Sequence, residues 1–138
     1  MKKCRGFTLV ELMVVILIVA ILAAVAIPIL RGRIDAAKWS EGKAMMGTIG
    51  TAIRAYHAEK GPTGTAPANL IGSGDADLGF TAADLTGTYF TSGDFSFSGV
   101  TMDPLAFTVT CTAGGDTDAP TTPPSWTLDE TGVWTPGS

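Results

Sequence analysis

The chain has few of the residues on which catalytic sites and metal centres depend. It contains one histidine, His57, and two cysteines, Cys4 and Cys111, among 138 residues. No Ser/His/Asp or Cys/His spacing indicates a nucleophilic site, and no Cys/His spacing or glycine-rich loop indicates a zinc or phosphate site. We therefore expect no enzymatic activity.

Positive charge is missing from the second part of the chain. After Lys60 there are nine acidic residues and no lysine or arginine, although the net charge of the whole chain is only −4. Contacts to phosphate need lysine and arginine, so we expect no direct binding of nucleic acid. The acidic residues either keep an exported domain soluble or pair with the basic N-terminal part of another subunit, and the sequence leaves both open.

A long apolar segment lies close to the N-terminus. Residues 12–30 are all apolar, which is about the length of helix that crosses the hydrocarbon core of a bilayer. The basic residues Lys2, Lys3 and Arg5 precede it, so the N-terminus is expected inside the cell and the rest outside. Glu11 stands at the start of this segment, where a carboxylate is costly, and is therefore a functional candidate.

The residues that link the basic leader to the apolar segment form a motif. They read Gly6-Phe7-Thr8-Leu9-Val10-Glu11, and Pro28 follows further along. This N-terminus resembles that of type IV pilins and of the pseudopilins of type II secretion systems. The resemblance implies that a prepilin peptidase and methyltransferase cuts between Gly6 and Phe7 and methylates the new amine of Phe7.

The same resemblance assigns assembly roles to Glu11 and Pro28. It implies that Glu11 neutralises the terminal ammonium of a neighbouring subunit in a filament. An ammonium and a carboxylate are each costly in a low-dielectric bundle, and pairing them across two subunits offsets both costs and fixes the register. Pro28 weakens the backbone ladder of the helix and is expected to kink it or to unwind it locally on assembly.

The order of elements predicts an α+β, pilin-like fold. A long N-terminal helix, half transmembrane and half amphipathic, is expected to pack on a small C-terminal antiparallel sheet. The expected divisions are a leader (1–6), a transmembrane assembly helix (7–30), an amphipathic helix of the head (31–60), a connecting region (61–93) and the sheet (94–138). Lys60-Gly61-Pro62 is expected to end the helix.

Within the head, apolar spacing identifies the packing surfaces. Helical periodicity predicts a stripe made of Ile34, Met45, Ile49, Ala52, Ile53 and Tyr56. The connecting region is expected to have little regular structure apart from a short helix at Thr81–Asp84. Alternation after residue 94 predicts strands, with a final hairpin turning at residues 129–131. Residues 116–124 are expected to form a mobile loop.

No cofactor is expected, with calcium as the alternative. Hard cations bind clustered oxygens, and the acidic head offers Asp75, Asp77, Asp94, Asp103, Asp116 and Asp118 without a spacing that selects among them. Cys4 leaves with the leader, so Cys111 has no partner for the C-terminal disulfide that many pilins carry.

The sequence therefore predicts a structural subunit of a type IV pilus-like filament. Its expected partners are further copies of itself, the prepilin peptidase, the assembly platform in the inner membrane and, before assembly, that membrane. The precursor is expected to be a single-pass inner-membrane protein, and the mature subunit to belong to an extracellular pilus or a periplasmic pseudopilus. One alternative is a pseudopilin of a type II secretion system. Another is a secreted acidic binding module whose first 26 residues are a discarded signal peptide ending at an Ala-x-Ala site.

Overall fold

The structure, a computed structural model, describes residues 6–138, and it divides into two compact units. One unit ends at Ile34, and the other extends from Asp35 to Ser138. The basic residues of the leader and Cys4 lie outside the described residues.

Helix α1 (Leu9–Lys60) contributes its first part to one unit and its second part to the other. Gly61 ends it as expected: its φ is +75°, and its amide donates to the carbonyl of His57 over 2.9 Å. Glycine adopts this left-handed conformation without a steric cost, which explains why the helix stops there.

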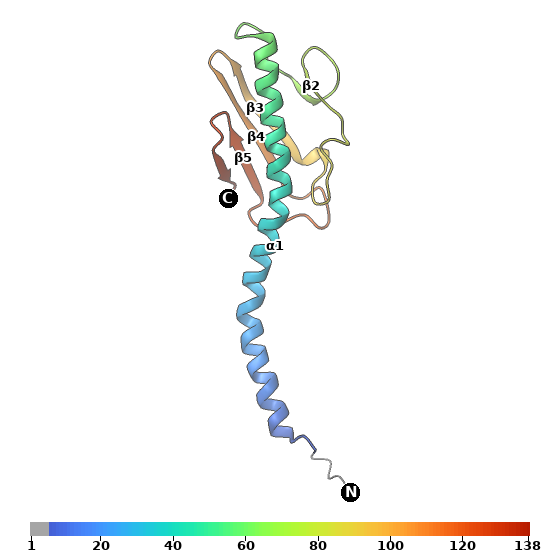
Figure 1. Ribbon diagram of the computed structural model, residues 1–138, viewed down its shortest axis with the longest axis vertical. Coiled ribbons are helices and arrows are strands. Elements are labelled where there is room, and N and C mark those ends of the chain that lie inside the picture. The colour runs from blue at the N-terminus through green and yellow to red at the C-terminus, as the bar shows by residue number, and fades with distance from the viewer. Residues whose placement is uncertain (1–5) are drawn as a thin grey trace. The chain divides into compact units, whose positions relative to one another are not determined.

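A four-stranded antiparallel sheet forms the other layer of the head, as the alternating sequence predicts. Its order is β3-β4-β5-β6, with β3 at Phe95–Met102, β4 at Leu105–Thr112, β5 at Ser125–Asp129 and β6 at Trp134–Pro136. The predicted terminal hairpin is present, with Leu128 paired to Trp134. In Figure 1 the second part of α1 lies against the face of this sheet.

The core forms where the helix meets the sheet. Trp39, Met46, Ile49 and Ile53 recur at intervals of three, four and seven residues and are almost completely buried. They pack with the inward side chains of the sheet, which include Phe95, Phe107, Val109, Cys111 and Leu128. Burial of this alternating set supplies the main stabilisation of the head.

The predicted stripe on the helix is partly wrong. Ile49, Ile53 and Tyr56 are buried, but Met45 and Ala52 are only half-buried and Ile34 is 45% exposed. The buried face also includes Gly42 and Gly50, which an apolar pattern does not count. Because glycine has no side chain, the sheet and its loops can approach the helix closely at these two positions.

The connecting region has more structure than expected. It contains β1 (Asn69–Ile71) and β2 (Asp77–Phe80), which form a two-stranded parallel sheet, and a short 3-10 helix, η1 (Ser92–Asp94). The helix expected at Thr81–Asp84 is a turn instead. The capping hydrogen bonds between these two residues do form, so the local chemistry was predicted correctly but the chain does not continue as a helix.

Candidate functional site

The expected processing junction lies just before α1. Gly6 and Phe7 belong to no helix or strand and are exposed, with Phe7 76% exposed. A Cβ built on Gly6 meets nothing within 4 Å. The chain is therefore accessible to another protein on both sides of this peptide bond.

Glu11 closes a capping box at the start of α1. Its Oε2 accepts hydrogen bonds from the amide of Thr8 at 2.9 Å and from the hydroxyl of Thr8 at 2.6 Å. The amide of Glu11 in turn donates to Thr8 Oγ1 at 3.2 Å. Such reciprocal bonds satisfy two of the amides that a helix start leaves without partners.

This second role of Glu11 was missed, although the pattern Thr8-x-x-Glu11 is a recognised capping signature. The box holds the carboxylate at the N-terminal end of the helix, close to Phe7, which is expected to become the new N-terminus. A carboxylate there also complements the positive end of the helix dipole. The arrangement fixes a negative charge at the position where an ammonium group is expected.

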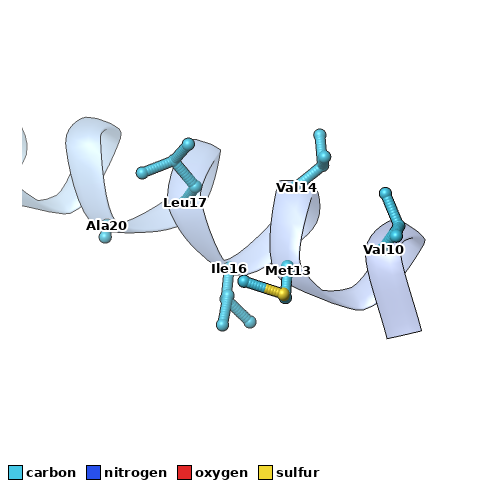
Figure 2. A pocket seen from close by; sticks show the side chains of 6 residues that line it. All are labelled: Val10, Met13, Val14, Ile16, Leu17 and Ala20. Carbon is cyan, nitrogen blue, oxygen red and sulfur yellow. The ribbon is translucent and has the colours of Figure 1, made fainter.

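The first part of α1 presents an uncovered apolar surface. Every large apolar side chain from Leu9 to Leu30 is exposed, the least of them by 48%. Five of them and Ala20 line a shallow groove, shown in Figure 2: Val10, Met13, Val14, Ile16, Leu17 and Ala20. The helix is long and apolar enough to cross a membrane, judged by its length and composition. A surface of this size is covered by lipid or by protein.

Pro28 lies inside α1. Proline has no amide hydrogen and clashes with the carbonyl four residues earlier, so it weakens the ladder at this point. Gly32 follows it, and a Cβ built there meets nothing within 4 Å. The helical ladder in this segment is supported by no side-chain packing within the described unit.

The start of the head, in contrast, is fastened by the loop expected to be mobile. Asp35 Oδ2 accepts hydrogen bonds from Thr121 and Thr122, at distances from 2.9 to 3.2 Å. Lys38 Nζ forms an ion pair with Asp118 at 2.7 Å and also donates to its carbonyl. The hydrogen bond from Lys38 to the carboxylate of Asp118 raises the pKa of Lys38. The loop is therefore docked on α1, and the prediction of a mobile loop is wrong.

Two further cations of the second half of α1, Lys43 and Arg54, also make contacts within the head. Lys43 Nζ lies 3.3 Å from the ring centre of Trp126 and 5.7 Å from that of Trp134, a cation–π contact with the terminal hairpin. Arg54 donates to the carbonyl of Glu130 at 3.0 Å.

Cys111 is a core residue of β4. It is fully buried and makes no disulfide within the described residues. Burial, together with the charge of Asp94, raises the pKa of its thiol to about 12. The thiol thus stays protonated and unreactive at neutral pH.

The aspartates offered as calcium ligands are spread over several loops. Asp77 accepts from Asn69 and from the amide of Gly74, which lowers its pKa. Asp118 pairs with Lys38. Among residues 6–138, no three histidine, cysteine or acidic side chains are grouped so as to hold a metal ion. Calcium binding stays a prediction with no site attached to it.

The structure thus consists of an α+β head and an apolar helical segment whose side chains are exposed. Comparison with known proteins assigns this architecture to a family. Residues 1–27 match the family model of the prokaryotic N-terminal methylation motif. The chain is 32% identical to the type IV major fimbrial protein FimA of Dichelobacter nodosus, over 95% of this chain and 86% of that protein.

Two further relatives are similar to this chain over a shorter stretch of its sequence. Fimbrial protein EcpC of Eikenella corrodens is 40% identical over 41% of this chain and 37% of its own length. The type IV major pilin protein PilA of Myxococcus xanthus is 45% identical over 41% of this chain and 26% of its own length. No solved structure matches the chain.

The chain belongs to the type IV pilin family. It is a structural pilus subunit with the N-terminal methylation motif, and nothing in the comparisons favours a pseudopilin in particular. The relatives are structural pilins, in agreement with the expectation of a non-enzymatic protein. The match of residues 1–27 to a methylation motif favours the pilin interpretation over a signal peptide discarded after residue 26.

Proposed function

We propose that this chain is inserted in the inner membrane as a precursor, cut between Gly6 and Phe7, methylated on Phe7 and packed through its N-terminal helix into an extracellular homopolymer. The uncovered apolar surface of α1 carries this proposal. The same surface serves two successive environments, first lipid and then the helices of neighbouring subunits. Neither requires a cofactor.

Glu11 supplies the register of this packing. Its carboxylate is held at the helix start by Thr8, and both bonds that it accepts from Thr8 fall on Oε2. The ammonium of Phe7 in an adjacent subunit is the natural counter-charge. A pair of this kind, surrounded by apolar helices, is strongly favoured over either charge alone.

Pro28 allows the helix to change its conformation when it packs in the fibre. The packed fibre has to accommodate many apolar helices side by side, and the segment around Pro28 has the weakest backbone ladder. We infer that this segment unwinds on assembly, while the part of α1 that packs on the sheet stays helical.

The direct test is replacement of Gly6 by leucine. A bulky residue before the cut should block cleavage, because the peptidase must enclose the backbone there. Mass spectrometry of the protein from membranes should then find an intact leader, whereas the unaltered chain should begin at N-methylated Phe7.

A matched control is Gly32→Leu, which places the same side chain where a Cβ meets nothing within 4 Å and lies well beyond the junction. It should be cleaved normally. A normally shortened product from Gly6→Leu, or a natural N-terminus at Ile27, would contradict the proposal.

A further inference from the structure

The distal end of the head carries three acidic side chains that make no hydrogen bond or ion pair within residues 6–138. They are Asp75, Asp103 and Glu130, which we call the acidic rim. They come from three different turns: the β1–β2 connection, the β3–β4 turn and the β5–β6 turn.

Residues near the C-terminal end of α1 contact all three of these connections between strands. Arg54 donates to the carbonyl of Glu130, and the hydroxyl of Tyr56 donates to the carbonyl of Asp75 at 2.9 Å. His57 Nε2 lies 2.9 Å from the carbonyl of Met102, the residue before Asp103. Three nearly consecutive helix residues thus gather the rim around the C-terminal end of α1, where the helix dipole is also negative.

The cations of the head do not neutralise this rim. Lys38 pairs with Asp118, Lys43 lies on two tryptophan rings, and Lys60 lies 3.6 Å from Glu59. Arg54 donates to the backbone carbonyl of Glu130 and lies over the ring of Phe107, and it forms no ion pair with a carboxylate in the part of the chain that the structure describes.

Two cations elsewhere in the described chain have no acidic partner. Arg31 and Arg33 are exposed, lie immediately after the apolar segment and form no ion pair within residues 6–138. Their guanidinium groups suit carboxylates, to which they bind through two parallel hydrogen bonds.

We propose that Arg31 and Arg33 of one subunit bind the acidic rim of a second copy of this chain. The inference rests on the proposed filament and identifies a contact that the apolar helices alone do not provide. The two surfaces differ, so the contact is head-to-tail, and a repeated head-to-tail contact produces an open fibre and not a closed ring. Charge complementarity selects the partner: within residues 6–138, Arg31 and Arg33 have no acidic partner and the acidic rim has no basic one.

Charge exchange tests this contact. The variants R31E/R33E and D103K/E130K should each reduce the yield of sheared filaments by at least about tenfold, since like charges then face each other. The four changes combined restore opposite charges, and should return the yield to within about threefold of the unaltered chain.

A milder pair of variants separates position from net charge. D103N/E130Q removes two negative charges from the head and S98K/T112K adds two positive ones, so both raise its net charge by two. Ser98 and Thr112 are exposed residues of strands β3 and β4 and do not belong to the acidic rim. Only the first should reduce filament yield. Two controls should give the same result for every variant as for the unaltered chain. Protease accessibility of the head in spheroplasts measures membrane insertion, and thermal unfolding in detergent measures whether the head is folded.

The outcomes separate this inference from the proposed function. Normal filaments from R31E/R33E, equal losses from both milder variants, or no recovery in the combined variant would overturn the inference and leave the filament intact. Absence of filaments from the unaltered chain would overturn the proposed function itself.

Discussion

The two halves of helix α1 have opposite relations to the rest of the chain. From Leu9 to Leu30 the large apolar side chains are all exposed, while from Trp39 to Tyr56 one face is buried against the sheet. One continuous element thus has a part that is complete within the monomer and a part that needs a partner. The second half of α1, packed on the sheet, contributes to the stability of the head, and the exposed first half serves assembly.

The boundary between these halves is itself built from specific contacts. Asp35 and Lys38 hold the loop at residues 118–122, and the indole of Trp39 donates to the carbonyl of Pro123 at 3.1 Å. Before Asp35 no such contact supports the helix within its unit. Changes in the first half should therefore affect assembly alone, and changes in the second half should affect folding.

The largest expected effect follows from replacing Glu11 by alanine. The change removes a charge from the apolar segment, which favours insertion, but leaves the ammonium of a neighbouring Phe7 without a partner in the fibre. Filaments should be lost, or lose regular order in electron micrographs, while the protein still accumulates in the membrane.

The matched control for Glu11 is Thr8→Val. This change removes the hydroxyl of the capping box but leaves the carboxylate. It should weaken the helix start by about 1 kcal/mol and preserve filaments. Equal filament loss in both variants would attribute the effect to capping, and normal filaments from Glu11→Ala would contradict the pairing.

Much of this comparison was predictable from the sequence. The apolar run predicts the exposed half, Gly61 predicts the helix end, and alternation at Phe95, Phe107 and Val109 predicts the sheet. These features are local, since each depends on a periodicity or a single residue with a special conformation.

The features that were missed depend on contacts distant in the sequence. Strands β1 and β2 are only three and four residues long and do not alternate clearly, so their pairing becomes visible only in the folded chain. The docking of the 116–124 loop depends on Asp35, which is 86 residues from Thr121. Ile34 was placed on the buried stripe because periodicity does not show where the sheet ends.

A density map of the filament tests whether the two halves of α1 also differ in backbone conformation after assembly. We expect non-helical or stretched backbone within roughly residues 20–32, because Pro28 cannot donate to the ladder and Gly32 costs about 1 kcal/mol relative to alanine. The segment from Ile34 to Tyr56 should stay helical. Cryo-electron microscopy of the filaments measures both, and an unbroken straight helix through Pro28 would refute the expected unwinding.

The smallest expected effect concerns two glycines in the second half of α1, which differ only in what surrounds them. A Cβ on Gly42 would lie 2.9 Å from Phe90 Cζ and 3.3 Å from the ring of Trp39, whereas a Cβ on Gly47 meets nothing within 4 Å. The Phe90 ring is fully buried and packed between the rings of Trp39 and Phe95, with centroids 5.0 and 6.0 Å away, so it has little room to move.

Alanine at the two positions should therefore change stability in opposite directions. Gly47→Ala should raise the free energy of unfolding of the head by about 0.5–1 kcal/mol, since alanine favours the helix. At Gly42 the same gain is outweighed by overpacking, which costs about 1–3 kcal/mol, so Gly42→Ala should lower the stability. Denaturant unfolding of the detergent-solubilised protein, followed by tryptophan fluorescence, measures both. Stabilisation by both variants would show that the contact between Phe90 and the helix is looser than this structure has it, and that the second half of α1 is less firmly held than the comparison requires.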